Sequence, residues 1–579
     1  MRTLTLLLGT LLALGAQAAE PGAERPQVLA HYLGWFENRP VRGDVIWEHW
    51  SYKLHGTPHD ASVIGADGKR DISSVFYPLI GPYDSNDPDV LEYHVLAAKS
   101  AGIDGFVLDW YQPGAMTDVA LKFLAANGAK YKFKVAACYE EKAAFPGYRN
   151  PKTRDDAVQL AISDFTYILK EYGSSPSYVR WNGKPLVLMF LGGGQFAGKE
   201  AVFDYMELAK IKEAVKSPDW ILVREHVEPS FWGSARGGFE WVGEAGYHDW
   251  IGKTAGELKA KKRLDLFIPG VSPGFDSSGV SGWSDGQTHP IIDRENGEYY
   301  VKQWDRAIGL KPELVQIITW NDFQEGSVIE PTFQFGNQYL DATERMVEKF
   351  NGRKAEVSDN DLAFKLYQLR KAARKQFGPG SDEEKKIQAK LDGVVQQLVD
   401  GKGKDARQAL DSLADVIGWK WLPRITPDQE FARYEPPLDP KIAQAYDLIK
   451  SPSNLARGKP VEVSASDPSA PDCRKLVDGD STTRWASTYN EPHWVRFDLG
   501  AAHKISKLVL DWETAHAKNY GVEVSSDGEH WTSVASVKDS PGGVETVSFP
   551  STEARYVRLQ LAERSTSWGF SLWEVGIFE

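Results

Sequence analysis

Between residues 27 and 350, short apolar runs alternate with longer amphipathic stretches. The runs that predict strands are Val28–Trp35, Gly105–Tyr111, Phe133–Tyr139, Pro185–Leu191, Trp220–Val227, Leu264–Val271 and Leu314–Trp320, with a weaker candidate at Ala245–Ile251. Helical periodicity is typical of Asp89–Ala101, Asp155–Tyr172, Lys199–Val215 and Gln338–Phe350. Repeated strand–helix units predict a parallel sheet. Eight runs over this length favour an α/β fold, a (β/α)8 TIM barrel over residues 19–355.

A doubly wound sheet is the alternative architecture for this pattern. It is disfavoured because no Gly-rich dinucleotide fingerprint follows the first predicted strand. Gly192-Gly193-Gly194 follows a strand but lacks the Lys of a phosphate-binding loop.

The pattern changes twice after the predicted barrel. Helical periodicity returns in Leu362–Phe377, Asp382–Val399 and Asp405–Val416, which predicts a small helical connector and linker over residues 356–453. From residue 454 short strands separated by turns predict an all-β jelly-roll sandwich over 454–579. Its strand candidates are Val495–Leu499, Lys507–Asp511, Gly521–Ser525, Trp531–Val534 and Tyr556–Leu561. Ser526-Asp527-Gly528 predicts a hairpin.

The first 18 residues are typical of an export signal. Arg2 gives a positive start, Leu4–Leu14 is a short apolar run, and Ala16-Gln17-Ala18 places small residues where a signal peptidase cleaves. We therefore expect removal of residues 1–18 and a mature chain, beginning near Ala19, that is periplasmic or secreted. No later run reaches the roughly 18 apolar residues of a membrane span, so none is predicted.

The amino-acid composition restricts the kinds of molecule that this protein is expected to bind. Lys and Arg number 67 against 80 Asp and Glu, and the formal net charge is −13. Because binding to phosphates needs a concentrated basic surface, no nucleic-acid partner is expected. The 20 Trp, 23 Tyr and 25 Phe provide flat apolar faces that pack cores and stack on sugar rings. Cys138 and Cys473 fall in different predicted domains, so we expect two separate thiols. The sequence sets no oligomeric state.

The most informative loop follows the last predicted strand of the barrel and carries Asn321, Asp322 and Glu325. Two carboxylates three residues apart, just beyond a buried strand, can face one cleft and divide the acid and base roles of glycoside hydrolysis. The alternative is an acidic turn in which the carboxylates only cap backbone N–H groups. Spacing alone leaves both possibilities open.

Acidic and aromatic residues recur at other predicted strand ends. Asp109-Trp110-Tyr111 ends the second strand, Tyr139-Glu140-Glu141 the third and Glu225-His226 the fifth, and Asp249-Trp250 lies near the sixth. Strand ends share one face of a barrel, so the recurrence favours a sugar cleft. The substrate-binding candidates are Tyr32, Trp47, His49, Tyr83, Asp109, Trp110, Tyr139, Glu140 and Asn321.

No cofactor is expected for catalysis, because glycosyl transfer to water needs only carboxylates. His31, His49 and His94 lack the close paired spacing of a zinc motif, so hydrogen bonding to substrate or burial is favoured for them.

Four motifs, in order along the chain, resemble the glycoside hydrolase family 71/99-like group. They are Trp47-Glu48-His49-Trp50, Tyr77–Ser85 with Asp87-Pro88, Ala101–Gly105, and Trp320–Pro331. The resemblance covers about residues 27–350. It implies an endo-acting α-glycosidase on a (β/α)8 barrel, with α-mannan or α-1,3-glucan as family substrates.

Family 99 carries Trp-Asn-Glu-x-x-Glu, in which the first Glu engages the substrate 2-hydroxyl and the second is the acid/base. Residue by residue, the resemblance assigns these catalytic roles to Asp322 and Glu325. The change from Glu to Asp retracts the carboxylate by one methylene and departs from the pattern of the mechanism through a 1,2-anhydro sugar. It is closer to family 71. Glu330, before Pro331, is interpreted as structural.

The C-terminal sequence resembles a coagulation factor 5/8 type C (discoidin) domain. The motifs are Asn454–Pro460, Asp478–Trp485 and Leu572–Val575. Carbohydrate-binding module family 32 is the usual companion of an exported glycosidase within that fold. The resemblance implies a structural Ca²⁺ held by oxygen ligands; the alternative is an Asx turn without metal. The implied ligands are Asp478, Asp480, Thr483 and Glu574, and loop aromatics that could contact sugar are Trp485, Tyr489, His516 and Trp568.

Together these features predict an exported glycoside hydrolase that cleaves an α-linked polysaccharide or glycan and is tethered to it by a carbohydrate-binding module. Two alternatives stay open. One is a non-catalytic carbohydrate-binding protein on a degenerate barrel, which Asp322 favours; the other is an adhesion protein whose discoidin domain is the functional part.

Overall fold

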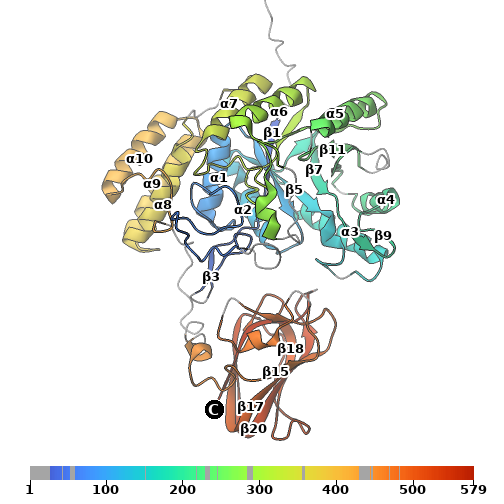
Figure 1. Ribbon diagram of the computed structural model, residues 1–579, viewed down its shortest axis with the longest axis vertical. Coiled ribbons are helices and arrows are strands. Elements are labelled where there is room, and N and C mark those ends of the chain that lie inside the picture. The colour runs from blue at the N-terminus through green and yellow to red at the C-terminus, as the bar shows by residue number, and fades with distance from the viewer. Residues whose placement is uncertain are drawn as a thin grey trace, which may run out of the picture.

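A computed structural model describes residues 27–579 except 42–43, 52–58, 150, 217, 228–234, 244, 283–290, 355–358, 430–443, 445–446, 468–469, 481–482 and 567. The predicted signal, residues 1–18, lies outside the described residues. Figure 1 shows a large body of strands and helices above a smaller body of strands. Among the described residues no helix is long and apolar enough to cross a membrane.

Within the described residues, eight parallel strands form a closed barrel, as predicted. In order they are β1 (Gln27–Tyr32), β4 (Gly105–Trp110), β5 (Lys134–Glu140), β7 (Lys184–Phe190), β10 (Ile221–Glu225), β11 (Gly237–Phe239), β12 (Leu266–Ile268) with β13 (Gly270–Val271), and β14 (Leu314–Ile317). β12 and β13 are two halves of one strand, interrupted at Pro269. The first half pairs with β11 and the second with β14, which pairs with β1 and closes the ring.

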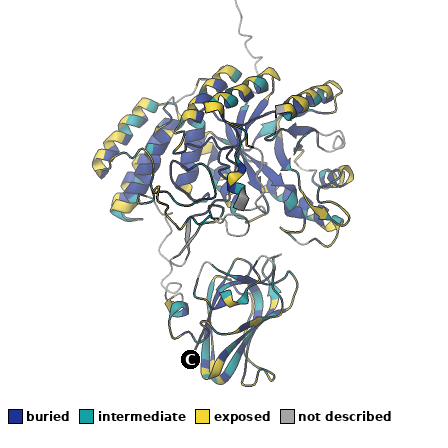
Figure 2. Cartoon of the chain, in the orientation of Figure 1, coloured by how far each residue is buried: buried dark blue, intermediate teal, exposed yellow. Residues whose placement is uncertain are grey.

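Helices surround the strands and bury the barrel between them. They are α1 (Pro88–Ser100), α2 (Met116–Tyr131), α3 (Arg154–Glu171), α4 (Tyr205–Ala214), α5 (Ala245–Ala260), α6 (Glu298–Gly309) and α7 (Gln338–Asn351). Their starts follow the sequence: Thr153 and Asp156 form a capping box for α3, and Asp204 and Glu207 form one for α4. Figure 2 shows buried strands and helices exposed on their outer faces.

Two sequence predictions in the barrel are wrong. Ala245–Ile251, the weak strand candidate, is the first part of α5, and the sixth strand is β11, whose Gly-Gly-Phe sequence carries no apolar run. A Cβ at Gly238 would lie 2.9 Å from the carbonyl oxygen of His226, so packing there selects glycine rather than a β-branched residue. The helix predicted over Lys199–Val215 begins only at Tyr205.

Short strands complete the region around the barrel. They are β2 (Arg39–Val41) paired with β3 (Asp44–Ile46), β6 (Arg180–Trp181) paired with β7, and β8 (Gln195–Phe196) paired with β9 (Lys199–Glu200).

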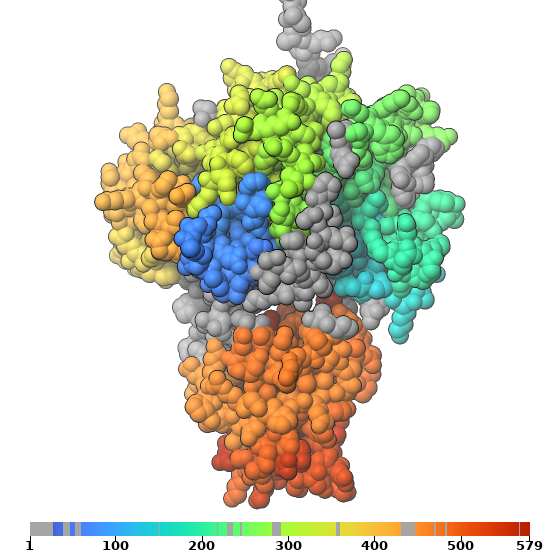
Figure 3. Space-filling model, viewed as in Figure 1, coloured from blue at the N-terminus to red at the C-terminus, as the bar shows by residue number. Residues whose placement is uncertain are grey.

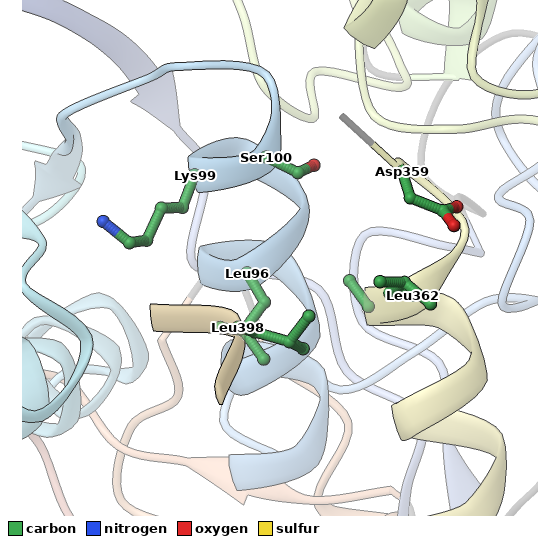
Figure 4. Close-up of a pocket in the computed structure, with 7 residues that line it drawn as sticks. Leu96, Lys99, Ser100, Asp359, Leu362 and Leu398 are labelled. Atoms are coloured by element: carbon green, nitrogen blue, oxygen red, sulfur yellow. The ribbon is translucent and has the colours of Figure 1, made fainter. Parts of the chain in front are cut away.

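The helical connector packs against the barrel rather than standing apart from it. Its helices are α8 (Leu362–Phe377), α9 (Asp382–Val399) and α10 (Gly403–Ile417). Leu96 of α1, Leu362 of α8 and Leu398 of α9 meet around a cavity of only about 20 Å³ (Figure 4). The hydrophobic core of the connector is therefore continuous with that of the barrel.

Three buried or half-buried cations of α8 pair with two acidic residues of α1 and with Asp87, the residue that caps its N-terminus. Arg370 contacts Glu92, Lys371 contacts Asp87, and Arg374 contacts Asp89. Ion pairs with such limited access to water are costly to break, because the remaining charge stays buried. They tie the connector to the barrel.

The C-terminal domain is an antiparallel sandwich, as predicted. Its strands are β15 (Val461–Val463), β16 (Trp485–Ala486), β17 (His493–Trp512), β18 (Ala517–Ser525), β19 (Thr532–Val537), β20 (Val544–Arg564) and β21 (Ser571–Phe578). The predicted Ser526–Gly528 hairpin joins β18 and β19. Both cysteines are free thiols: Cys138 is buried in the barrel, and Cys473 is half-buried in the sandwich.

Replacing Gly105 by Ala should destabilise the barrel. The new Cβ would lie 2.6 Å from the carbonyl oxygen of Lys134 on the neighbouring strand, and overpacking of this kind costs about 1–3 kcal/mol. Gly393→Ala in α9 is the matched control, since its Cβ meets nothing within 4 Å and a helical Gly→Ala change stabilises by about 0.5–1 kcal/mol. Thermal unfolding of the full chain should shift in opposite directions for the two variants; shifts of the same sign would contradict this account.

Candidate active site

Carboxylates gather where the strands of the barrel end. Asp109 and Glu140 end β4 and β5, and Asp322 and Glu325 follow β14. They lie close enough that the charges of Asp322, Asp109 and Glu140 all raise the pKa of Glu325. In Figure 1 the loop after β1, marked by β3, lies on the side of the barrel that faces the sandwich. This face is therefore the candidate active site.

Asp322 and Glu325 are fixed in one turn. The Asp322 N–H donates to Oγ1 of Thr319 over 2.7 Å, and Oδ1 of Asp322 accepts the N–H of Glu325 over 2.8 Å. Asp322 is 5% exposed, whereas Glu325 is half-buried. The capping alternative therefore accounts for Oδ1 of Asp322, whereas the Glu325 side chain keeps partial exposure to solvent.

The environment pushes the pKa values of the carboxyl groups apart. Burial, followed by the charge of Asp322, raises the pKa of Glu325 well above its usual range. Burial raises the pKa of Asp322 to about 6. The pKa of Glu140 is raised to about 8 by burial, against the lowering effect of Lys142. Two neighbouring carboxyl groups held in different environments are the arrangement that acid and base roles require.

Asn321 is a buried support for the loop. Its Oδ1 accepts the N–H of Leu33 over 2.8 Å, and its Nδ2 donates to the Leu33 carbonyl oxygen over 2.9 Å and to the Tyr83 hydroxyl over 3.0 Å. The Tyr83 hydroxyl donates in turn to Oε2 of Glu330 over 2.8 Å. Asn321 and Tyr83 were predicted to bind substrate, but their polar groups are used inside the protein.

Tyr32 belongs to the same buried network. Its hydroxyl lies 3.0 Å from Nδ1 of His94, and Nε2 of His94 lies 3.3 Å from Oε1 of Glu330. All three side chains are at most 2% exposed. The structure therefore does not bring Tyr32 to a surface that sugar can reach, and Glu330 has the buried position of a structural residue.

Trp110 and Tyr139 also point away from the cleft. The Trp110 indole N–H donates to Oδ1 of Asp118 over 2.8 Å, and the Tyr139 hydroxyl donates to Oδ2 of Asp164 over 3.1 Å. Both rings are fully buried against the helix layer. Trp250, predicted near a strand end, lies on α5 and is 52% exposed, so that prediction is wrong.

Asp109 is held by a buried cluster below the carboxylates. Its Oδ1 lies 2.8 Å from Nε2 of His31, and Nδ1 of His31 lies 3.1 Å from Nε2 of Gln316. Among the described residues, His31, Asp109 and Cys138 form the one group of three or more His, Cys, Asp or Glu side chains whose ligand atoms lie within 4.8 Å of one another. Both imidazole nitrogens are engaged in hydrogen bonds, and burial raises the pKa of the Cys138 thiol. The cluster therefore suits the positioning of Asp109.

Aromatic rings and one cation form the wall of the site beside Glu140. Tyr111 and Tyr148 are stacked with ring centroids 5.2 Å apart, and the Lys142 ammonium lies 5.5 and 5.8 Å from their centroids. Nζ of Lys142 lies 3.2 Å from Oε2 of Glu140. Lys142 stands two positions after Glu140, but no motif in the sequence marks it as part of the site.

His49 and Trp47 lie on the loop after β1. The His49 ring stacks on Trp35 at a centroid distance of 5.0 Å, and burial together with Lys142 lowers its pKa to about 3. His49 is therefore neutral at physiological pH. The Trp47 ring is half-buried beneath the Arg70 guanidinium, 4.5 Å from the ring centroid.

The predicted Ca²⁺ ligands of the sandwich lie together where described. Oε1 of Glu574 accepts the N–H of Gly479 over 2.6 Å, and Oδ2 of Asp478 accepts the Thr483 hydroxyl over 2.8 Å. Burial and the adjoining Asp478 carboxyl raise the pKa of Glu574 to about 9. Two crowded carboxyl groups with neighbouring hydroxyl and carbonyl oxygens fit the donor set of a hard cation. The carbonyl oxygen of Asp480 accepts the Thr483 hydroxyl over 3.2 Å.

Two family models match this chain, one over the barrel and one over the sandwich. The model of glycosyl hydrolase family 99 matches residues 25–197 and 234–359, about half of the chain, and the F5/8 type C domain model matches residues 460–575. The chain belongs to glycosyl hydrolase family 99. This family 99 protein is thus a glycoside hydrolase with a C-terminal carbohydrate-binding domain.

Named relatives cover the barrel. The chain is 27% identical over 386 residues to a glycoprotein endo-alpha-1,2-mannosidase-like protein of Mus musculus, covering 58% of this chain and 80% of the relative. It is 28% identical over 343 residues to the glycoprotein endo-alpha-1,2-mannosidase of Rattus norvegicus, covering 54% and 70%. A solved family 99 endo-alpha-mannosidase of Bacteroides thetaiotaomicron aligns at 24% identity and a TM-score of 0.44, covering 56% of this chain and 98% of that one.

Replacing Lys142 by Gln in the family 99 enzyme should move its pH profile. Lys142 lowers the pKa of both Glu140 and Glu325, so both values rise when the cation is removed. An acid must be protonated to act, so the alkaline limb of kcat/KM should move to higher pH by about one unit. Lys142→Arg, which keeps the charge, should leave the limb in place. An unchanged profile in Lys142→Gln would show that the cation does not act on the acid.

Proposed function

We propose that this family 99 enzyme is exported and cleaves internal α-linkages of mannan-type polysaccharides or glycans. The observation that carries the proposal is the Asp322–Glu325 turn, whose two carboxyl groups have raised but different pKa values at the mouth of a family 99 barrel. The relatives described as endo-alpha-1,2-mannosidases support α-mannosides as the substrate class.

Glu325 serves as the acid in this proposal. Burial raises its pKa and so favours the protonated form, from which it can give a proton to the glycosidic oxygen as the leaving sugar departs. Once ionised, it can accept a proton from the attacking water, which restores the starting state. Lys142 limits how far the pKa of Glu325 rises, so the proton stays transferable.

Asp322 engages the sugar on the other side of the reacting carbon. Thr319 and the Glu325 N–H hold its backbone and Oδ1 in place, so its carboxylate is preorganised where charge changes during cleavage. Its pKa of about 6 leaves it largely ionised at neutral pH, as an acceptor for a sugar hydroxyl requires. Because the Asp322 side chain is one methylene shorter than that of Glu, the substrate must lie closer to this loop to reach its carboxylate.

Features near the two ends of the chain support export of the enzyme and its attachment to carbohydrate. The signal-like residues 1–18 support a periplasmic or secreted enzyme. The F5/8 type C domain supports attachment to a carbohydrate. The structural Ca²⁺ belongs to this domain, where Asp478 and Glu574 would share its charge.

Glu325→Gln should lower turnover on α-mannan at least about a hundredfold, because it keeps the shape of the side chain and removes the transferable proton. Asn321→Asp is not a suitable control, since it would disturb the loop; Glu298→Gln on the outer helix α6 leaves the site untouched. Product analysis on a panel of α-mannans and α-glucans measures both rate and linkage. Near-normal cleavage by Glu325→Gln would remove Glu325 from the acid role, and a wild-type enzyme active only on α-glucan would overturn the substrate class.

Calcium should stabilise the sandwich more at pH 8 than at pH 5. The pKa of Glu574 rises from its ordinary 4.5 to about 9 on folding, so without a cation the domain loses stability as pH rises through this range. A cation that offsets the two carboxylates restores it. Calorimetry of the full chain should show a chelator lowering the sandwich transition at pH 8 and much less at pH 5.

Glu574→Gln is the matched variant for this experiment. It mimics the protonated side chain, so it should melt in chelator at least as high as the wild type at pH 8 and respond little to calcium. Equal melting of the wild type with and without chelator, with no bound calcium by elemental analysis, would assign the Asp478 turn to a metal-free Asx turn.

A further inference from the structure

A cleft of about 890 Å³ lies between the loops of the barrel and the sandwich. Gln112, Arg149 and Asp164 are among the residues on its barrel side, and Arg484, Tyr489 and Trp568 are among those on its sandwich side. Figure 3 shows the sandwich, orange to red, set against that end of the barrel. A volume of this size is within the range of ligand sites and large for a single small ligand.

The barrel side of the cleft adjoins the active site through Tyr111. Gln112 follows Tyr111 in the chain, and Arg149 donates from Nη2 to the Tyr111 carbonyl oxygen over 2.8 Å. The Tyr111 ring lies beneath Lys142, which pairs with Glu140. Tyr111 thus has its ring beside the Lys142–Glu140 pair and its carbonyl oxygen bonded to a residue of the cleft, which places the cleft next to the active site.

The sandwich side presents the chemistry of a sugar platform. Tyr489 and Trp568 are half-buried, their ring centroids are 5.7 Å apart, and the rings are inclined by 45°. The guanidinium of Arg484 is fixed beside them by a 3.0 Å hydrogen bond from Nη1 to Oγ of Ser571. Inclined aromatic faces with a fixed donor suit the C–H faces and hydroxyl groups of successive sugars. Trp485, by contrast, is fully buried in the sandwich core.

We propose that the barrel and the sandwich bind one and the same glycan chain, with Tyr489 and Trp568 holding sugars remote from the bond at Glu325. The inference rests on the proposed function and specifies its substrate class: a polysaccharide or large branched glycan that spans the cleft. A tether that only anchors the enzyme to distant material would not require these rings to face the barrel. Binding by the remote sugars lowers KM and raises the local concentration of the scissile segment.

The test compares full-length Trp568→Ala and Tyr489→Ala with Trp531→Ala. Trp531 is a matched control because its ring, half-buried beneath Arg558, lies on the sandwich but not among the described residues of the cleft. On a soluble, long α-mannan the cleft variants should raise KM at least about fivefold with little change in kcat. On a short oligosaccharide of the same linkage all three should match the wild type. Equal KM values for wild type and cleft variants on the long substrate would overturn the inference.

A second measurement separates a shared cleft from an independent tether. A flexible Gly-Ser insertion after residue 436 should raise KM on the soluble long chain if both domains bind the same molecule, because the effective concentration falls with linker length. An independent tether would keep its KM after the insertion, which would contradict the proposal. Wild-type enzyme that cleaves neither substrate would instead contradict the proposed function. Binding of the long mannan to Glu325→Gln, with and without Trp568→Ala, gives a readout that does not depend on turnover.

Discussion

The barrel closes through the strand Leu266–Val271, whose two halves lie on either side of Pro269 and join the two ends of the sheet. Pro269 has no N–H to donate, but its carbonyl oxygen accepts the N–H of Gln316 on β14 over 3.0 Å. The first half of the strand then pairs with β11 and the second with β14. Closure brings β14 next to β1, and with it the Asp322 loop next to Leu33 and Asp109. The chemistry of the site therefore depends on a hydrogen-bonded ring without an edge.

Within that ring the main difficulty is electrostatic. Several carboxyl groups share one poorly hydrated mouth, and like charges that close cannot all be ionised. The protein meets this by keeping Glu325 and Glu140 protonated more strongly than usual and by setting one cation, Lys142, against the aromatic wall. His31 holds Asp109 from below. The arrangement that makes the site unfavourable for folding is the same one that makes it able to transfer a proton.

The order of the domains, most strands of the barrel and the loop of Asp322 and Glu325 could be predicted from the sequence, because apolar runs and family motifs carry them directly. β11 could not, since Gly237 and Gly238 are selected by close packing rather than by apolar side chains. Two of the predicted substrate-binding residues, Trp110 and Tyr139, lie away from the site for a geometric reason. Successive residues of a strand face opposite sides, so Asp109 faces into the barrel while its neighbour Trp110 reaches the helix layer and bonds Asp118.

Because of the ion pairs between α1 and α8, the catalytic unit of this enzyme consists of the barrel together with the connector helices. The family resemblance ends at residue 359, yet Asp87, Asp89 and Glu92 find their cations beyond that point. A chain that stopped there would expose the apolar side of α1 and remove the α8 cations of Asp87, Asp89 and Glu92, although Glu92 would keep its contacts with Lys130 and Tyr131 of α2. The smallest heritable module that could be exchanged between proteins therefore includes the three connector helices. The sandwich, with a hydrophobic core of its own, can be gained or lost without them.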